Sequence, residues 1–464
     1  MARLKRNNHE GTPDSEYLPR DLPSVLEAKK KRLTAMDITQ PRIMMIEITS
    51  SFSSRLEYRN RKQNKKQALQ IKASLERKEI HLMMPKIILF CHFIMNEKFL
   101  SVVWYKILPA HYGGQQGIAN FNQHLGYKIS LSCLCSSNNI DNGTLSYQLL
   151  PALPVNKTQF VNPLVRKKIL SLIHQQKFSH IILEHPYHAW LANYRQTSGF
   201  KLIVHAHNIE FLRMKQRGKW WWRWVKQTEK KAFRKADFIL FKTEKDKKLA
   251  IEQFKIPATK CLLLPYGIHT ASHYLKQNKI EAALKIRQQY HMQAGEKIFL
   301  FAGTLTYEPN QEALQNIVQH ILPLLRQNMN TAFRIFICGN QSAETIQQLN
   351  RNPNIIATGF VHNVEDYFLA ADVFINPVVS GSGVQTKNFD AIAYGTSVAT
   401  TSYAAEGLPP YLTGQKVLIA PDNNWPLFTQ NVIQLSRQSV PTPPAFYQEF
   451  YWGSLIDKIL NKVL

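Results

Sequence analysis

The chain has 464 residues, 44% of them hydrophobic, which is enough to bury the cores of two domains. Its 58 lysines and arginines against 32 acidic residues give a formal net charge of +26, which favours anionic partners such as nucleic acid, anionic lipid or an anionic substrate. No apolar run reaches the roughly 18 residues that a membrane-spanning helix needs. The five cysteines lie mostly in apolar stretches typical of reduced core thiols, so the sequence predicts a cytoplasmic protein.

Residues 1–94 differ from everything that follows. They are basic and polar, with charge runs at 29–32 and 59–66, and they lack a sustained hydrophobic period. This composition predicts a disordered basic extension. Two origins stay open: a tail that binds a membrane or a partner, and a start codon assigned too far upstream.

The first domain is predicted at residues 95–270. An apolar strand at 98–105 leads to the turn Gly113-Gly114, a helix and a second strand, which together form a βαβ opening. Strands and helices then alternate as far as a strand at 261–264. This alternation predicts a mostly parallel, doubly wound sheet, whose ligands bind beyond the carboxyl ends of the strands.

Polar residues gather directly after two of these predicted strands. The first cluster includes Glu184, His185 and His188, and the second includes His207 and Glu210. Histidine and glutamate at such spacings are also found as zinc ligands. A polar lining of a substrate cleft explains them as well, and so does a hydrogen-bonded structural histidine. We favour the cleft.

A long helix is predicted at 211–235, with four tryptophans among many lysines and arginines. At helical spacing, Trp221 and Trp224 would pack inward and leave Trp220 and Trp222 beside a dense basic face. Core packing explains some of these tryptophans. Indole rings at the headgroup level, with lysines reaching past them, are typical of an interfacial helix. The sequence therefore predicts a peripheral contact with an anionic membrane, on the inner face of the cytoplasmic membrane.

The second domain is predicted at 296–444, after a linker at 271–295. It begins with a strand at 297–302, and a last helix is predicted at 445–464. Short turns follow its first predicted strands, at Gly303-Thr304, Gly339 and Gly359-Phe360-Val361.

The stretch 354–408 carries the most specific pattern. A strand at 373–377 leads into a loop of glycine and serine, and a helix follows from about 386 to 394, closed by Gly395. Such a loop exposes backbone amides, and the helix dipole adds partial positive charge, so it suits a phosphate. Lys387 lies in the first turn of this helix, where its positive charge is unfavourable beside the positive end of the helix dipole. Its presence there therefore favours a bound anion. The alternative is a flexible connection followed by a solvated lysine.

This stretch resembles the donor half of the group 1, family 4 retaining glycosyltransferases, which have the GT-B fold. The matching residues are 380–383, Lys387, Asp390-Ala391, Ala393, Gly395, 397–401 and 406–408. The likeness covers the chain from about residue 98 and is strongest in its second half. It implies an α/β protein with two Rossmann-like domains facing a cleft. It also implies no metal ion or other cofactor, and a final helix that returns to the first domain.

By this resemblance, Lys387 is a catalytic residue that stabilises the departing diphosphate, and His207 is a second one that contacts a sugar or acceptor hydroxyl. The residues expected to bind the donor are Gly303, Thr304, Gly339, Gly359, Phe360, Val361, Ser382, Gly383, Val384, Gln385, Thr386 and Asp390. The residues expected to face the acceptor are Gly113, Gly114, His185, His188 and Glu210. Glu210 is expected either to orient His207 or to cap the helix that follows.

The sequence departs from the family pattern at three of these positions. Ser382 replaces the first of the family's two acids, so loop amides are expected to hold the sugar instead. The second acid is Asp390, one methylene shorter than glutamate, which is expected to accept hydrogen bonds from the ribose hydroxyls. Thr304 stands where the family often has an arginine, so Lys387 is expected to carry more of the phosphate charge.

The sequence thus predicts a glycosyltransferase that moves a sugar from a nucleotide-diphosphate sugar to a cell-envelope glycan or a lipid-linked acceptor. Two alternatives stay open. One is a non-catalytic protein of the same fold that binds a nucleotide sugar or an anionic glycan, because the first acid is missing. The other is a basic nucleic-acid-binding protein. We expect no nucleic-acid partner, because the sequence carries no helix-turn-helix, zinc-finger or RNP motif.

Overall fold

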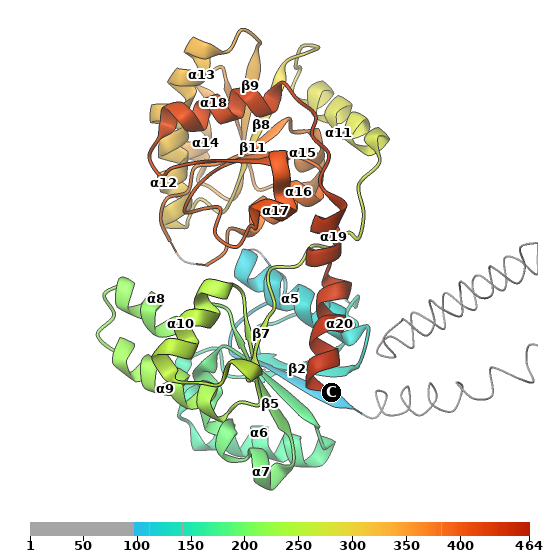
Figure 1. Ribbon diagram of the computed structural model, residues 1–464, viewed down its shortest axis with the longest axis vertical. Helices are drawn as coiled ribbons and strands as arrows, with labels where there is room; N and C mark the ends of the chain where they lie inside the picture. Colours follow the sequence, from blue (N-terminus) through green and yellow to red (C-terminus); the bar gives the residue numbers. More distant parts are fainter. Residues whose placement is uncertain (1–96, 111, 142, 382) are drawn as a thin grey trace, which may run out of the picture. The chain divides into compact units, whose positions relative to one another are not determined.

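A computed structural model of the chain describes residues 97–464, except 111, 142 and 382. The predicted basic extension at 1–94 lies outside the described residues. Two parallel sheets follow one another along the described part of the chain (Figure 1). The prediction of two Rossmann-like, parallel-sheet domains is confirmed.

Within the part that the structure describes, the first sheet has seven parallel strands in the order β3-β2-β1-β4-β5-β6-β7. The order reverses between β1 and β4, so the carboxyl ends of these two strands form a topological switch point. The strands are β1 (Lys98–Val103), β2 (Ser130–Ser136), β3 (Gln148–Leu153), β4 (His180–Glu184), β5 (Lys201–Ala206), β6 (Phe238–Phe241) and β7 (Cys261–Leu263). The helices are α5 (Gly113–Gly126), η1 (Lys157–Phe160), α6 (Pro163–Gln176), η2 (Pro186–Asn193), α7 (Arg195–Ser198), α8 (Glu210–Gln216), α9 (Trp222–Lys235), α10 (Glu244–Phe254) and η3 (Ala258–Lys260).

The second sheet has six parallel strands among the described residues, in the order β10-β9-β8-β11-β12-β13, and its switch point lies between β8 and β11. The strands are β8 (Lys297–Ala302), β9 (Phe333–Cys338), β10 (Ile355–Gly359), β11 (Val373–Asn376), β12 (Ser397–Thr401) and β13 (Val417–Ala420). The helices are α11 (Lys276–Gln289), α12 (Glu308–Asn316), η4 (Ile317–Ile321), α13 (Leu322–Asn328), α14 (Ala343–Asn350), α15 (Glu365–Ala370), α16 (Thr386–Ala393), α17 (Pro410–Thr413), η5 (Gly414–Lys416), α18 (Trp425–Ser436), α19 (Pro444–Phe450) and α20 (Trp452–Val463).

Helices bury both faces of the first sheet, which is why its central strands are nearly continuous apolar runs. Side chains of α6, α9 and α10 pack against one face. Side chains of α5 and of the last helix, α20, pack against the other face, where Phe99 and Trp452 are fully buried. Figure 1 shows α20, in dark red, beside α5. The C-terminal helix therefore completes the core of the first sheet.

Three differences from the sequence prediction concern the first sheet and the helices that cover it. The predicted helix at 211–235 is two helices, α8 and α9, because Gly218 between them has a φ of +65°. The predicted helix at 445–464 is also two helices. The backbone of Tyr451 is extended, so α19 ends before this residue and α20 begins after it. Strand β3 was not predicted, because its sequence contains a proline. A proline is tolerated there because β3 is an edge strand that pairs only with β2.

The tryptophans of the basic segment also lie differently. Trp221 and Trp222 pack against the core between the first sheet and helices α6, α9 and α10, whereas Trp220 and Trp224 are 88% and 48% exposed. The break at Gly218 changes the helical register on which the prediction relied. Among the described residues, the longest apolar helices fall short of what crossing a membrane requires.

Candidate functional site

The predicted phosphate loop lies after β11, at the switch point of the second sheet. Gly381 and Gly383 have φ values of +116° and +85°, which residues with a side chain rarely adopt. A Cβ on Gly381 would also lie 2.9 Å from atoms of Tyr307 and Pro309. The path of the loop therefore requires both glycines. Ser382, between them, lies outside the described residues.

Three further glycines of the predicted donor site end neighbouring strands of this sheet. The backbone N–H of Gly303 donates to the carbonyl of Cys338 at 2.9 Å, and that of Gly339 donates to the carbonyl of Gly359 at 2.9 Å. A Cβ on Gly339 would lie only 1.8 Å from the carbonyl oxygen of Gly303, so this approach requires glycine. The strand order thus brings Gly303, Gly339 and Gly359 to one edge of the sheet. The predicted donor residues Thr304, Phe360 and Val361 directly follow them.

Lys387 and Asp390 stand one turn apart on α16 and bind each other. The distance between Lys387 Nζ and Asp390 Oδ2 is 3.1 Å. The hydroxyl of Tyr266 donates to the other oxygen, Asp390 Oδ1, at 3.3 Å. Asp390 therefore offsets the charge of Lys387 beside the helix dipole, so that charge by itself does not require a bound anion, in contrast to the sequence argument. A phosphate at this site would share Lys387 with Asp390.

Residues from the two sheets approach each other near the start of α16. A Cβ on Gly113 would lie 2.8 Å from Thr386 Oγ1, and a Cβ on Gly383 would lie 3.0 Å from Asn208 Oδ1. The predicted acceptor turn and the predicted donor loop are therefore in contact. Val384 packs into the second core, and Gln385 precedes α16 without a side-chain capping bond.

Glu184, the last residue of β4, is the centre of a buried cluster. Its Oε2 lies 2.6 Å from His207 Nε2 and 2.9 Å from His205 Nδ1. The side chains of Glu184 and His205 are fully buried, whereas 11% of the His207 side chain is exposed. The ammonium group of Lys242, just after β6, is also buried and has no hydrogen-bond partner within the described residues. One carboxylate, two imidazoles and one amine are thus buried at the ends of three neighbouring strands, β4, β5 and β6.

Burial controls the protonation of this cluster. It raises the pKa of Glu184 to about 8, an effect that the charge of Lys242 opposes. It lowers the pKa of Lys242 to about 8, an effect that Glu184 opposes. Burial and neighbouring positive groups lower the pKa values of His205 and His207 well below 6.5. Both imidazoles are therefore neutral at pH 7, and each has one N–H and one bare nitrogen.

Glu210 belongs to a second network. Its Oε2 accepts hydrogen bonds of 2.7 Å from the hydroxyl of Tyr187 and from Arg213 Nη2, and His185 Nδ1 lies 3.4 Å from its Oε1. Burial alone would raise the pKa of Glu210, but His185 and Arg213 lower it to about 2. The expectation that Glu210 orients His207 is wrong, because Glu184 contacts His207. Glu210 lies in the first turn of α8, but its side chain does not cap the helix, because the N–H groups of Glu210 and Phe211 donate to the carboxylate of Glu229.

The remaining acceptor-side candidates lie around these networks. His185 and His207 have ring centres 4.6 Å apart. Gly114 packs on the ring of Tyr112. His188 is 3% exposed and packs edge-on against Phe160 and Trp190, with ring centres 5.2 and 6.3 Å away. The structure therefore brings His185 to the buried cluster and places His188 in an aromatic core.

Glu184, His205 and His207 are also the residues that could hold a metal ion, because their ligand atoms lie within 4.8 Å of one another. One carboxylate and two imidazoles are ligands that zinc accepts. Two ligands in a tetrahedral zinc site, each about 2.1 Å from the ion, lie roughly 3.4 Å apart. The distances here, 2.6 and 2.9 Å, are shorter. The 2.6 Å contact of His207 is a hydrogen bond, whereas His205 Nδ1 has no hydrogen-bond partner among the described residues. The geometry therefore favours the hydrogen bond between Glu184 and His207 over a zinc ion held by all three side chains.

Sequence reasoning missed two members of this cluster. Glu184 was recognised as polar but not as the partner of His207, and Lys242 was not singled out. The available signal was the position of Lys242 directly after the buried strand Phe238–Phe241. A polar residue at a strand's carboxyl end is a candidate site residue in a parallel sheet.

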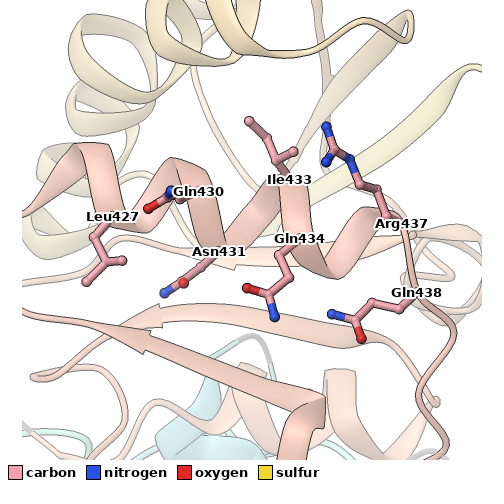
Figure 2. A pocket seen from close by; sticks show the side chains of 7 residues that line it. All are labelled: Leu427, Gln430, Asn431, Ile433, Gln434, Arg437 and Gln438. Carbon is pink, nitrogen blue, oxygen red and sulfur yellow. The ribbon is translucent and has the colours of Figure 1, made fainter.

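A hollow of about 620 Å³ lies elsewhere, along α18 (Figure 2). Its lining is mostly amide and aliphatic, from Leu427, Gln430, Asn431, Ile433, Gln434, Arg437 and Gln438. It contains one charged side chain and none of the residues predicted to bind a substrate. We therefore place the candidate site at the strand ends and not in this hollow.

Two family models match the chain. The family described as "Glycosyl transferases group 1" matches residues 296–438, and "Glycosyltransferase Family 4" matches residues 123–272. Together they span more than half of the sequence and include both strand-end clusters and the glycine loop.

Individual proteins resemble the chain more distantly. An uncharacterized 44.6 kDa protein in the cps region of Klebsiella pneumoniae is 28% identical over 146 residues, which cover 30% of this chain and 37% of that protein. The match thus spans little more than a third of this relative. Sucrose-phosphate synthase from Thermosynechococcus elongatus has a TM-score of 0.59 at 14% identity, over 79% of this chain and 98% of that one. Anabaena HepE, solved in complex with UDP-glucose, has a TM-score of 0.56 at 12% identity, over 79% and 100%. At these identities the structures show a shared fold.

Proposed function

Because the chain belongs to the group 1, family 4 glycosyltransferases of the GT-B fold, we propose that it transfers a sugar from a nucleoside-diphosphate sugar to a cell-envelope glycan or a lipid-linked acceptor. The observation that carries this proposal is the glycine loop that leads into α16, with Lys387 in its first turn. The UDP-glucose bound by HepE supports the donor class. The cps-region relative supports a role in the cell envelope.

The proposed chemistry follows from charge. When the bond between the sugar's anomeric carbon and the diphosphate breaks, the diphosphate leaves with the bonding electrons and its negative charge grows. The acceptor oxygen bonds to the carbon, and its proton passes to a phosphate oxygen of the leaving diphosphate. Loop amides, the positive end of α16 and Lys387 would stabilise the leaving group more in the transition state than in the ground state. Asp390, which binds Lys387 and Tyr266, would hold the lysine in place or accept hydrogen bonds from the ribose hydroxyls.

This proposal predicts the effect of removing Lys387. A panel of nucleotide sugars should reveal at least one donor from which the protein releases nucleoside diphosphate in the presence of acceptor. With that donor at saturation, Lys387→Ala should lower turnover by roughly 100-fold or more, the scale of one lost charge-stabilising donor.

The matched control is Lys285→Ala, which also breaks a lysine–aspartate pair, between Lys285 and Asp366, in the same half of the chain. It should leave turnover close to that of the wild type. Normal turnover in a folded Lys387→Ala protein would contradict the proposal and favour a non-catalytic nucleotide-sugar-binding protein.

We also infer that residues 215–224, from the end of α8 to the first turn of α9, contact an anionic membrane surface. Trp220 and Trp224 are exposed there. Lys215 and Arg223 lie over the ring of Trp222 at 5.4 and 5.3 Å. Exposed indoles beside cations are typical of proteins that bind at the headgroup level of a bilayer. This surface would bring the enzyme to a lipid-linked acceptor.

A further inference from the structure

The loop that joins β11 to α16 lies against the segment that follows β8. These two strands are neighbours at the switch point of the second sheet, so the segments that leave their carboxyl ends meet. A Cβ on Gly381 would lie 2.9 Å from the hydroxyl oxygen of Tyr307 and 2.9 Å from Pro309 Cγ. One residue earlier in the loop, the hydroxyl of Ser380 donates a hydrogen bond to Oε2 of Glu312, in the second turn of α12. Helix α12 thus brings a carboxylate to the glycine loop.

Glu312 and Asp390 both adjoin this part of the site, and they differ in their partners. Asp390 binds Lys387 with one oxygen and Tyr266 with the other. Glu312 makes one hydrogen bond within the described residues, to the uncharged Ser380, and no lysine or arginine among them pairs with it. Its Oε1 therefore has no partner there, and the side chain is partly exposed. Glu312 keeps a negative charge and an acceptor oxygen that a ligand can use.

The two ends of the loop consequently differ in charge. At the α16 end, the positive end of the helix dipole and Lys387 favour an anion. At the β11 end, Glu312 disfavours an anion, because like charges repel strongly in a partly buried site. A nucleoside-diphosphate sugar has a matching asymmetry, since its diphosphate is anionic and a simple hexose is neutral. Such a donor fits with its diphosphate at α16 and its sugar beside Glu312.

A carboxylate suits a sugar for a second reason. The backbone N–H groups of a glycine loop only donate hydrogen bonds, whereas every sugar hydroxyl also has a proton to donate. A carboxylate oxygen accepts from such a hydroxyl, and this charge-assisted bond is stronger than one between neutral groups. The same charge repels a sugar that carries its own carboxylate, such as a hexuronate. One side chain can thus favour one class of sugar and reject another.

We propose that Glu312 binds the donor sugar and restricts it to sugars without negative charge: Oε1 accepts a hydrogen bond from a hydroxyl of a neutral hexose, while the diphosphate occupies the α16 end of the loop. The inference rests on the proposed function and deepens it, since it names the class of sugar. It differs from the expectation that loop amides alone hold the sugar. The alternative role of Glu312 is to hold the loop in place through Ser380.

Equilibrium binding tests this role without an acceptor. UDP, GDP and dTDP are titrated first, and the hexose and hexuronate derivatives of the best-bound nucleotide follow, in the gluco, galacto and manno configurations. The wild type should bind its best hexose donor about 10-fold or more tightly than the hexuronate of the same configuration. Glu312→Gln should weaken binding of the hexose donor roughly 10-fold, the factor for one hydrogen bond to a charged group, and remove most of the preference. Its affinity for the free nucleoside diphosphate should stay at the wild-type value.

Two further variants separate sugar binding from loop support. Ser380→Ala removes the hydroxyl that binds Glu312 but keeps the carboxylate, so the preference for the neutral donor should remain. Glu281→Gln is the matched control, because Glu281, on α11, is a carboxylate whose partner is also uncharged, Gln277 Nε2 at 2.9 Å. This variant should bind every ligand as the wild type does.

An equal loss of affinity for the nucleoside diphosphate and for both donors in Glu312→Gln would overturn the proposal, because Glu312 would then only hold the loop. So would a wild type that prefers the hexuronate, or a preference that Glu312→Gln leaves intact. These outcomes leave the proposed function standing. If the wild type binds the hexose donor but transfers no sugar, the proposed function fails, and the ratio of the two affinities still decides the role of Glu312. If it binds none of the three nucleoside diphosphates, both proposals fail.

Discussion

Two of the charged groups at the candidate site, Lys387 and Glu210, are already bound to other side chains. Lys387 is paired with Asp390, and Glu210 with Arg213 and Tyr187. A substrate must therefore enter an existing network instead of neutralising free charges. Such a network holds its side chains in fixed positions before the substrate binds, which lowers the cost of ordering them in the transition state.

His188 should make the protein sensitive to acid. Burial, with a smaller effect of Arg166, lowers its pKa from 6.5 to about 4. Between these pH values the unfolded chain binds a proton at His188 that the folded protein does not, so stability falls as the pH decreases from 6.5 to 4. The full loss is about 3 kcal/mol, at 1.36 kcal/mol for each pKa unit.

His188→Phe should remove this part of the pH dependence, because phenylalanine does not titrate and suits the aromatic contacts with Phe160 and Trp190. Melting temperatures between pH 7.5 and 5 should decrease less steeply in the variant than in the wild type. The exposed His174 provides a control, and His174→Phe should melt with the wild-type slope. Equal slopes in all three proteins would show that His188 is not the group responsible.

At the scale of elements, the segment between α8 and α9 makes the surface that we expect to meet a membrane. Changing Trp220 and Trp224 to serine, with Lys219 and Arg223 to glutamine, should weaken co-sedimentation with vesicles that contain anionic lipid. Each basic residue near such a surface contributes about 1 kcal/mol. Trp221→Ser with Trp222→Ser is an unsuitable control, because these rings pack on the core. Exposed lysines of α11, changed to glutamine, provide a better one.

The order of the elements was predictable from local patterns, but contacts across strands were not. The apolar run at 180–184 ends at a glutamate, and most strands were predicted from apolar runs that end at a polar residue in this way. The choice of Glu184 over Glu210 as the partner of His207 depends on β4 lying beside β5, with Glu184 opposite His205. Sequence spacing favoured Glu210, which is three residues away. The break at Gly218 was visible only as an isolated glycine, which helices often tolerate.

For the molecule as a whole, the C-terminal helix joins the end of the chain to its first sheet. Trp452 is fully buried on the face of the first sheet that α5 and α20 cover, and its ring centre lies 6.4 Å from that of Phe121. Trp452→Ala should lower the free energy of unfolding by about 3–5 kcal/mol, the usual cost of emptying such a site. Denaturant titration measures this loss. Lys462→Ala, on the exposed side of the same helix, should change the free energy of unfolding little. If Trp452→Ala also leaves this free energy unchanged, α20 does not stabilise the first sheet.

The place of α20 also affects how the protein can fold during synthesis. All seven strands of the first sheet have left the ribosome soon after Leu263 is added. Helix α20, which covers one face of the sheet together with α5, begins at Trp452, about 190 residues later. At a synthesis rate of 5–20 residues per second, α20 is made roughly 10 to 40 s after the last strand of this sheet. A nascent chain of this protein therefore presents an apolar surface that includes Phe99 and Phe121 while its second sheet is still being made. Chaperones that recognise such surfaces have that interval in which to bind it.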